Sequence, residues 1–253
     1  FAAALSLGGI TPVVAIYSSF LQRAYDQIMH DVCMQNLHVV FAIDRAGLVG
    51  YDGETHHGIF DLSYLGSMPN MTILAPKLSD MIKFAVDYDG PIAVRYPRGE
   101  AYTGLKEFRA PICLGKSEVI HEGSRVALLA VGSMVKMAEE VQKQLKERMD
   151  MDAALVNARF VKPIDEELLR SFADTYELVV TLEENVKDGG FGERVLAFAE
   201  EEDLPFGVEI IALPDRFIPH GSVSYQMKQV GFTPEDICGR IEEYYRKQGQ
   251  EER

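Results

Sequence analysis

Histidine, arginine and carboxylate side chains gather in one glycine-rich stretch, residues 44–58. This stretch contains Arg45, Asp52, His56 and the adjacent His57. The pKa of a free histidine lies near about 6.5, so a histidine in a polar loop predicts proton transfer at neutral pH. Adjacent histidines in an extended segment point to opposite sides and seldom share one ion, so a metal site is the weaker alternative.

Arg45 and Arg98 each follow the end of an expected strand. Two guanidinium groups that converge there would grip a phosphate or carboxylate through paired hydrogen bonds. Isolated arginines more often form surface salt bridges, and the sequence leaves that alternative open. Tyr17 and Phe20 follow another strand, with Arg23 one turn beyond Phe20. Their rings offer flat faces to a ligand, although packing in the core is the more common role.

The elements that position these residues alternate between short apolar runs and amphipathic runs, which is typical of a parallel α/β fold. In the first half, strands are expected at residues 13–17, 39–43, 72–75 and 92–95. A second series is expected at residues 126–131, 153–156, 178–182 and 208–212. Ligand sites in open parallel sheets lie at the carboxyl ends of the strands, where these polar residues fall.

Helices are expected between the strands. Ser18 and Ser19 are predicted to cap a helix that extends to about Val32, because serine hydroxyls accept hydrogen bonds from the first free amides. The last helix is expected to begin with Thr233 as its cap and Pro234 in its first turn.

The predicted fold class is α/β, with two domains that each contain a parallel sheet. The periodic pattern lapses between Tyr96 and Gly115, where prolines and glycines recur. We therefore expect a first domain at residues 1–100, a linker at residues 101–115 and a second domain at residues 116–253.

Composition excludes several classes of function. The 253 residues carry 25 basic and 39 acidic side chains, a net charge of −14, so nucleic acid is not an expected partner. The 3 cysteines lie far apart, without the spacing of a disulfide framework or a zinc site, which favours a reducing, cytoplasmic location. The first 22 residues are uncharged, but glycines and a proline interrupt them. A buried core segment is therefore expected there rather than a signal peptide or a membrane span.

The second half holds two further polar stretches. Residues 183–185 read Glu-Glu-Asn, and residues 189–192 read Gly-Gly-Phe-Gly before an expected helix. A glycine loop before a helix is able to cradle a phosphate, but the spacing matches neither common nucleotide motif, so a tight turn is favoured. Residues 216–221, Arg-Phe-Ile-Pro-His-Gly, suggest no mechanism by themselves.

Read together and in order, these stretches resemble the 1-deoxy-D-xylulose-5-phosphate synthases, a thiamine-diphosphate family of the transketolase superfamily. The resemblance rests on residues 17–27 (YSSFLQRAYDQ), 44–50 (DRAGLVG), 52–58 (DGETHHG), 95–99 (RYPRG), 157–163 (NARFVKP), 183–185, 189–192 and 214–221 (PDRFIPHG). It spans nearly the whole chain, and the segment FLQRAYDQ is its most specific part. It implies a transketolase pyrimidine-binding domain without its amino-terminal part, followed by a transketolase C-terminal domain.

The resemblance also implies a reaction and a cofactor. Pyruvate and D-glyceraldehyde 3-phosphate would condense with loss of carbon dioxide, which is the first step of non-mevalonate isoprenoid synthesis and also feeds thiamine synthesis. Thiamine diphosphate would serve as the electron sink. By the resemblance, Phe20 stacks on the aminopyrimidine ring and Arg23 lines the same pocket, while His56 is the active-site histidine. Arg23 and His56 are the expected catalytic residues.

The substrate-binding residues also come from the resemblance. Tyr17 and Asp52 resemble residues near the donor and the hydroxyls of the acceptor, and Arg45 and Arg98 resemble a pair that grips the phosphate of the acceptor. For the two arginines, the role implied by the family agrees with the anion clamp that their own chemistry suggests.

Two motifs of this family do not occur in the chain. They are the glutamate that activates the cofactor and the Gly-Asp-Gly motif that holds Mg²⁺ and the diphosphate. We therefore expect Mg²⁺ ligands outside this chain, an amino-terminal diphosphate-binding domain as a companion segment, and a homodimer. The chain alone is expected to be inactive and to bind the cofactor poorly. The alternatives are the β subunit of a 2-oxo-acid dehydrogenase and an inactive, stable fragment.

Overall fold

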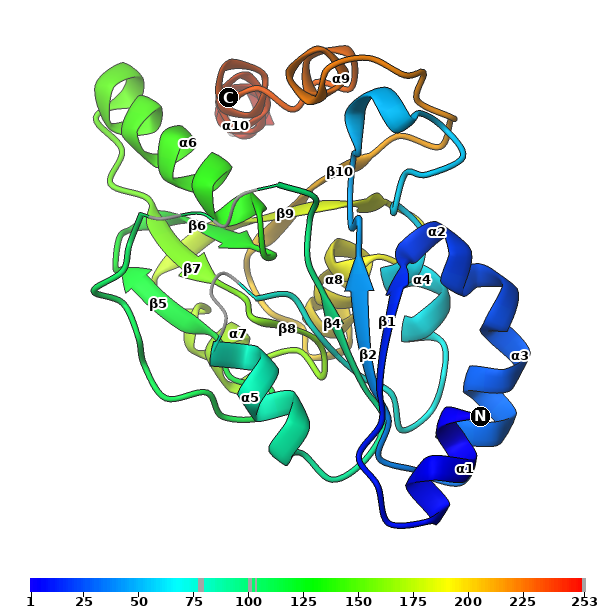
Figure 1. Cartoon of the computed structure of the whole chain (residues 1–253). Helices are drawn as coiled ribbons and strands as arrows, with labels where there is room; N and C mark the ends of the chain where they lie inside the picture. Colours follow the sequence, from blue (N-terminus) through cyan, green and yellow to red (C-terminus); the bar gives the residue numbers. More distant parts are fainter. Residues whose placement is uncertain (77–79, 100–101, 103, 252–253) are drawn as a thin grey trace.

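The computed structural model describes residues 1–76, 80–99, 102 and 104–251. Two five-stranded sheets form its framework, in the orders β1-β2-β4-β3-β8 and β10-β9-β6-β7-β5 (Figure 1). The pairs β3–β8 and β5–β7 are antiparallel and the other pairs are parallel. Residues 100, 101, 103, 252 and 253, which belong to the expected domains and linker, lie outside the described residues.

The strands of the first sheet are β1 (Val13–Tyr17), β2 (Val40–Asp44), β3 (Thr72–Leu74), β4 (Ile92–Arg95) and β8 (Phe160–Lys162). Those of the second are β5 (Glu118–His121), β6 (Arg125–Ala130), β7 (Ala154–Asn157), β9 (Tyr176–Val186) and β10 (Gly207–Leu213). The α-helices are α1 (Ala2–Leu7), α2 (Ser18–Leu21), α3 (Tyr25–Gln27), α4 (Asp61–Gly66), α5 (Asp80–Asp87), α6 (Met134–Met149), α7 (Glu166–Ser171), α8 (Phe191–Glu201), α9 (Val223–Gln229) and α10 (Pro234–Glu251). Short 3-10 turns η1 (Gln22–Ala24) and η3 (Gly50–Asp52) and a π-turn η2 (Ile28–Cys33) complete the elements.

These elements confirm the predicted α/β class with two sheets that are mainly parallel. The predicted strands lie within a few residues of the observed ones, because each is an apolar run between breakers. The short strands β5 and β8 were not predicted. The expected helix after β1 is present but changes hydrogen-bonding pattern through α2, η1, α3 and η2. The last helix begins as predicted, and the amide of Asp236 donates to the hydroxyl of Thr233.

One serine expectation is wrong. Neither Ser18 nor Ser19 caps α2, because Tyr17 occupies the position before the helix and makes no side-chain cap. Both serines lie inside the first helical turn and are buried. Their hydroxyls therefore face the interior rather than the free amides of the helix.

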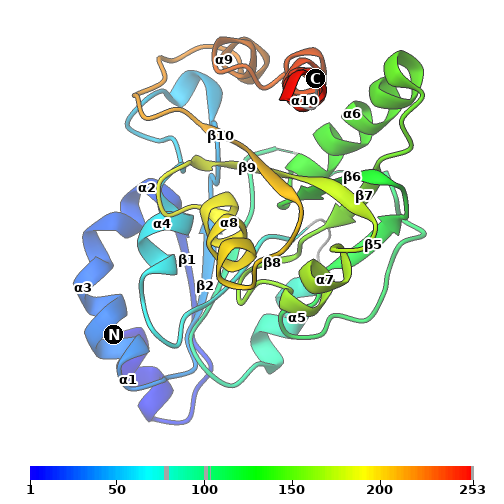
Figure 2. The same cartoon turned by 180° about the vertical axis from the view of Figure 1, so that it is seen from behind.

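The two sheets share a hydrophobic core. The cluster that contains Ile43 and Ile73 of the first sheet also contains Val156 and Val179 of the second. Strand β8 of the second half pairs with β3, so it extends the first sheet across the expected domain boundary. Figure 2 shows α8, α7 and α4 close to the region between the sheets, seen from behind. The domain bounds themselves stay a prediction, but the two halves pack as one body.

A second cluster covers the other face of the second sheet. It joins Val135 and Val141 of α6 to Leu128 of β6 and to Ile237 and Ile241 of α10. Figure 1 shows α6, α9 and α10 along this side of the molecule, with the two chain ends far apart. This packing fixes α9, whose side chains reach the first half of the chain.

Most of the uncharged first 22 residues are not buried, so the expectation of a buried core segment is wrong for most of that stretch. Helix α1 has no buried residue, and the side chains of Phe1 and Leu7 are exposed. Strand β1 is the edge strand of its sheet, and Val13 is also exposed. Within the described residues, no helix is long and apolar enough to cross a membrane.

Candidate active site

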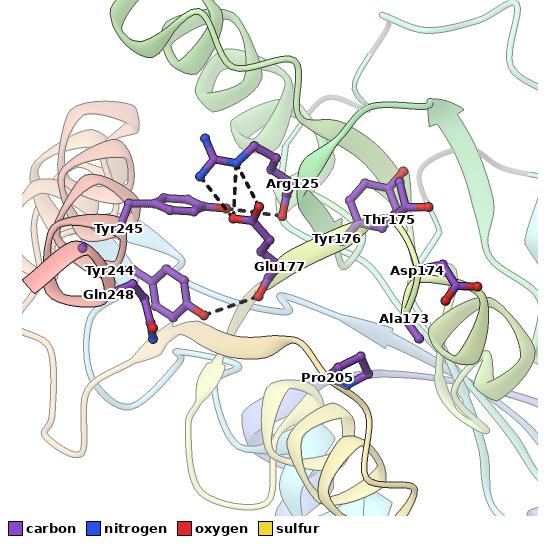
Figure 3. A pocket seen from close by; sticks show the side chains of 11 residues that line it. Arg125, Ala173, Asp174, Thr175, Tyr176, Glu177, Pro205, Tyr244, Tyr245 and Gln248 are labelled. Carbon is purple, nitrogen blue, oxygen red and sulfur yellow. Dashed lines mark hydrogen bonds and ion pairs between the residues drawn. The ribbon is translucent and has the colours of Figure 1, made fainter. Parts of the chain in front are cut away.

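A hollow of about 680 Å³ lies at the amino ends of β6 and β9, beside α10 (Figure 3). Its polar groups bind one another. The guanidinium of Arg125 pairs with the carboxylate of Glu177 at 3.1 Å and stacks on the ring of Tyr245. The hydroxyl of Tyr244 donates to the carbonyl of Glu177. None of the predicted site residues lines this hollow, which lies at the amino ends of strands of the second sheet, whereas the expected site lies at the carboxyl ends of strands of the first.

The carboxyl ends of β1, β2 and β4 bring the predicted residues together. Tyr17 pairs in register with Asp44, and Ile43 pairs with Arg95. The segments that follow these strands therefore start at the same edge of the sheet. This agrees with the position that the sequence predicts for a ligand site.

Four of the predicted side chains form a continuous row. The guanidinium of Arg45 lies 4.2 Å from the ring centroid of Tyr17. The Tyr17 and Phe20 rings stack at 5.4 Å with an interplanar angle of 17°. The ring of His56 meets Phe20 edge-on at 5.3 Å. Phe20 keeps 41% of its surface exposed, so the row presents an accessible aromatic face rather than a packed core.

The two arginines of the expected clamp are each held by a carboxylate. Arg98 donates to Asp52 at 2.6 Å, and Arg45 donates to Asp44 through both its backbone amide and its guanidinium. Within the described residues, no contact joins the two arginines. The structure therefore brings Asp52 to Arg98 and Arg45 to Tyr17, and it leaves the clamp itself a prediction.

Arg23 lies apart from this row. It is exposed on η1, and in the described part of the chain no hydrogen bond or ion pair connects it to the other predicted residues. Its place in the site therefore stays an expectation from the resemblance.

Buried polar atoms without partners mark the same edge of the sheet. In the described residues they include the hydroxyls of Ser18 and Ser19 and Nε of Arg45. A buried donor without an acceptor costs about 1–3 kcal/mol, so such atoms are usually paired. Together with the open face of Phe20, these atoms fit a flat, polar ring such as the aminopyrimidine of thiamine diphosphate.

His57 differs from His56. It is 2% exposed, its Nδ1 accepts from the amide of Val49 at 3.2 Å, and its Nε2 lies 3.0 Å from the carbonyl of Ile218. These partners fix a neutral ring that carries its proton on Nε2, and burial lowers the pKa of His57. His57 is therefore a structural link to residues 216–221, the stretch for which the sequence suggested no mechanism.

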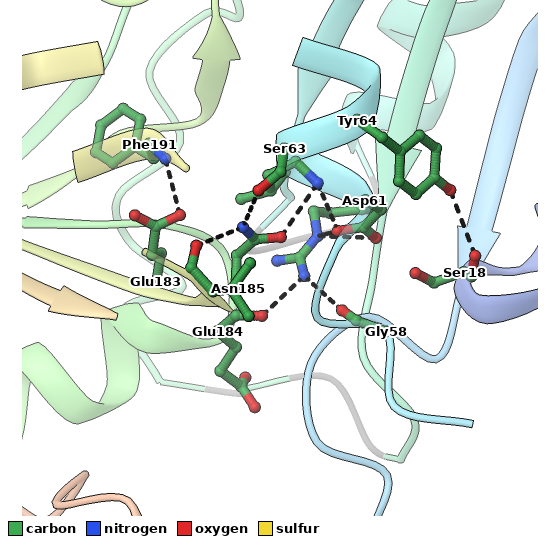
Figure 4. A network of polar contacts seen from close by, with 12 residues as sticks. Ser18, Gly58, Asp61, Ser63, Tyr64, Glu183, Glu184, Asn185 and Phe191 are labelled. Carbon is green, nitrogen blue, oxygen red and sulfur yellow. Dashed lines mark hydrogen bonds and ion pairs between the residues drawn. The ribbon is translucent and has the colours of Figure 1, made fainter. Parts of the chain in front are cut away.

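A buried ion pair beneath the site was missed by the sequence analysis. Arg95, at the end of β4, donates through Nε to Asp61 at 3.1 Å and through Nη2 to the carbonyls of Gly58 and Glu184, both at 3.1 Å (Figure 4). Asp61 is fully buried. Arg95 belongs to the segment of residues 95–99, which also contains Arg98. Nothing in that segment indicates which of the two arginines is buried.

The Glu-Glu-Asn stretch of β9 is also buried and binds groups in the interior (Figure 4). Glu183 accepts hydrogen bonds from the amides of Phe191 and Gly192 at the start of α8, and burial raises the pKa of Glu183 to about 7. These amides are the ones that a bound phosphate would need. The favoured tight-turn interpretation of residues 189–192 therefore agrees with the structure, and a phosphate cradle does not.

No group of three or more metal-binding side chains occurs among the described residues. The Mg²⁺ ligands, which the resemblance implies outside this chain, stay a prediction.

Comparison with known proteins identifies the two halves. Residues 1–103 match the pyrimidine binding domain of transketolase, and residues 115–237 match the transketolase C-terminal domain. A curated relative from Lachnoclostridium phytofermentans, named 1-deoxy-D-xylulose-5-phosphate synthase, is 49% identical over 95% of this chain. Another from Geobacter sulfurreducens, named 1-deoxy-D-xylulose-5-phosphate synthase 2, is 50% identical over 95% of the chain. The chain spans only 39% and 40% of these two proteins.

Two solved transketolase structures have a similar fold. A structure titled "Split gene transketolase, inactive beta4 tetramer" superimposes with a TM-score of 0.85 at 30% identity, covering 96% of this chain and 78% of that one. Transketolase from Campylobacter jejuni shares the fold, with a TM-score of 0.71 at 19% identity over 94% of this chain and 37% of that one. The chain therefore belongs to the transketolase family, as a pyrimidine-binding domain followed by the transketolase C-terminal domain.

Proposed function

We propose that this chain is part of a thiamine-diphosphate-dependent 1-deoxy-D-xylulose-5-phosphate synthase, which condenses pyruvate with D-glyceraldehyde 3-phosphate and releases carbon dioxide. The observation that carries the proposal is the row of Arg45, Tyr17, Phe20 and His56 at the carboxyl edge of the first sheet. The names of relatives at 49–50% identity support it.

Phe20 is the proposed platform for the aminopyrimidine ring of the cofactor, because its face is exposed beside Tyr17 and His56. The unpartnered hydroxyls of Ser18 and Ser19 lie at the same strand end. Bound thiamine diphosphate supplies an electron sink for decarboxylation. Arg23 would line the same pocket from η1.

His56 is the proposed proton-transfer residue. Its ring is partly exposed, and its Nδ1 lies 2.9 Å from the hydroxyl of Thr55, so Nε2 is the nitrogen left to meet a substrate. His57 is excluded from this role because both of its nitrogens bind protein groups. Tyr17 and Asp52 are the proposed contacts for substrate hydroxyl and carbonyl groups.

Arg45 and Arg98 are the proposed phosphate-binding residues. Nε of Arg45 has no hydrogen-bond partner among the described residues. The side chain of Arg98 pairs with Asp52 and remains partly exposed to solvent. A phosphate that binds there competes with Asp44 and Asp52 for the guanidinium groups. An acceptor without a phosphate offers no charged group to replace Asp44 and Asp52 as partners of the two arginines. The pair of arginines therefore favours a sugar phosphate over the lipoyl arm of a 2-oxo-acid dehydrogenase as the acceptor.

The remaining parts of the proposed enzyme lie outside this chain. Mg²⁺ and the diphosphate would be held by an amino-terminal domain, and the working unit would be a cytoplasmic homodimer. The exposed apolar side chains of Phe1, Leu7 and Val13 support a covering partner beside α1 and β1.

The test compares two acceptors. The complete gene product is supplied with thiamine diphosphate, Mg²⁺ and pyruvate, together with either D-glyceraldehyde 3-phosphate or D-glyceraldehyde. We expect product formation with a kcat/KM for the phosphorylated acceptor at least about tenfold higher, because charge-assisted contacts contribute about 1.5–3 kcal/mol each. Equal use of the two acceptors would contradict the phosphate site, and no product with either would contradict the proposed reaction.

A further inference from the structure

The loop of residues 45–58 follows an irregular backbone path. Four of its residues have positive φ angles, which are 60° at Arg45, 79° at Gly47, 74° at Gly50 and 75° at Gly53. Such a path offers no regular ladder of hydrogen bonds. The loop carries Asp52 and His56. Contacts from elsewhere in the chain that fix the conformation of the loop therefore also fix where these two residues lie.

Four successive amides of the loop are nevertheless all paired. Two of them bind acceptors within the loop itself. The amide of Gly47 donates to the carbonyl of Gly58 at 2.7 Å, and that of Val49 donates to Nδ1 of His57 at 3.2 Å. These bonds close the base of the loop but do not fix it against the rest of the molecule.

The amide of Leu48 is bound by Glu184 of the second half. Oε1 of Glu184 accepts from this amide at 3.3 Å, while Oε2 accepts from the hydroxyl of Ser133 at 2.5 Å. A Cβ atom on Gly47 would lie 2.6 Å from the same Oε1, so the loop backbone packs directly against the carboxylate. Glu184 is 5% exposed and burial raises its pKa.

The fourth amide, that of Gly50, is bound by Gln226 of α9. Oε1 of Gln226 accepts from this amide at 3.1 Å, and Nε2 donates back to the carbonyl of Gly50 at 3.1 Å and to that of Pro219 at 2.8 Å. Gln226 is fully buried. One side chain therefore holds both polar groups of Gly50, the residue where η3 begins.

We propose that Glu184 and Gln226 are positioning residues, through which the C-terminal domain sets the conformation of the loop that carries Asp52 and His56. Glu184 touches the loop backbone at Leu48, and Gln226 touches the backbone of Gly50 and the buried ring of His57. Neither contacts a predicted reacting side chain. The consequence for catalysis rests on the proposed function, whereas the consequence for the loop does not.

The loop is tested by amide hydrogen exchange, measured by mass spectrometry on the 253-residue chain. In Glu184→Met and Gln226→Met, we expect the amides of residues 47–50 to exchange about tenfold faster or more, because each change leaves a buried amide without its acceptor. In Glu184→Gln, we expect rates within about threefold of the native chain. A glutamine oxygen still accepts from Leu48, and its nitrogen donates to Ser133.

Glu183→Met is the matched control. Glu183 is the neighbouring residue of the same strand and is equally buried, but it binds the amides of Phe191 and Gly192 instead. Its loss should speed exchange at the start of α8 and leave residues 47–50 unchanged. The proposal is overturned if the loop exchanges at the native rate in both Glu184→Met and Gln226→Met, or equally fast in Glu183→Met. Gln226→Met and Glu184→Gln keep the test decisive if Glu184→Met does not fold.

Kinetics on the complete gene product supply the second readout. A positioning role predicts that Glu184→Met lowers kcat about tenfold or more, changes the KM for pyruvate less, and is largely rescued by Glu184→Gln. If Glu184→Gln is as inactive as Glu184→Met, the charge of Glu184 is what matters and the positioning role is wrong. If the gene product lacks the condensation activity while exchange responds as expected, the proposed function fails and this inference stands.

Discussion

Replacing Arg95 with methionine should lower the free energy of unfolding more than the same replacement of an exposed arginine. The change removes the partner of the fully buried Asp61 and the donor that binds the carbonyl of Glu184, while the carbonyl of Gly58 keeps only the amide of Gly47 among the described residues. Breaking a buried ion pair from one side costs about 3–5 kcal/mol, because an uncompensated charge remains in the interior. Among the described residues, the side chain of Asp61 then keeps the hydrogen bond from the amide of Leu62, at 2.9 Å.

The assay is urea unfolding followed by circular dichroism, with Arg98→Met as the matched control. Arg98 also pairs with an aspartate, but its side chain is 48% exposed, so its loss should cost less than about 1 kcal/mol. In the double variant Asp61→Leu and Arg95→Met, part of the loss should be recovered, because no unpaired charge remains. If Arg95→Met lowers the free energy of unfolding no more than Arg98→Met does, the buried pair of Arg95 and Asp61 does not stabilise the fold as proposed.

Three further predictions concern the site. Arg98→Ala in the complete gene product should raise the KM for D-glyceraldehyde 3-phosphate far more than that for pyruvate, with only partial rescue by Arg98→Lys, and equal effects would make Arg98 structural. His56→Ala should lower kcat with a smaller effect on KM, and the reverse pattern in steady-state kinetics would make His56 a binding residue. Burial holds the pKa of His57 below 6.5, so stability from its neutral ring is complete above about pH 6.5 and is lost as the pH falls below it. Urea midpoints at pH 8 and pH 5.5 should therefore differ less in His57→Asn than in the native chain, and an unchanged difference would refute the neutral link.

The sequence predicted the fold class and the edge of the sheet where Tyr17, Phe20, Arg45 and His56 meet, because both depend on local patterns. Alternating apolar runs define the strands, and polar residues after three strands must meet when those strands are parallel neighbours. The place of Arg45 beside the ring of Tyr17 agrees with this register, because Tyr17 pairs with Asp44, the residue before Arg45.

The interior contacts of Glu184 and Gln226 with the loop were beyond such reasoning, because they join residues more than one hundred positions apart in the chain. Glu184 reaches Leu48, and Gln226 reaches Gly50, from elements whose packing no local pattern specifies. Local reasoning also failed for Ser18, whose type suggested a helix cap although its position in the first helical turn buries the hydroxyl. His56 and His57 look equivalent in sequence, and only their partners separate a partly exposed ring from a buried link.

Carbon-13 NMR of the complete reaction tests the central claim most directly. The complete gene product is incubated with thiamine diphosphate, Mg²⁺, D-glyceraldehyde 3-phosphate and pyruvate labelled at its carbonyl carbon. We predict that the label appears at the ketone carbon of 1-deoxy-D-xylulose 5-phosphate, with one carbon dioxide released for each product molecule. Label recovered only in pyruvate would contradict the proposed condensation.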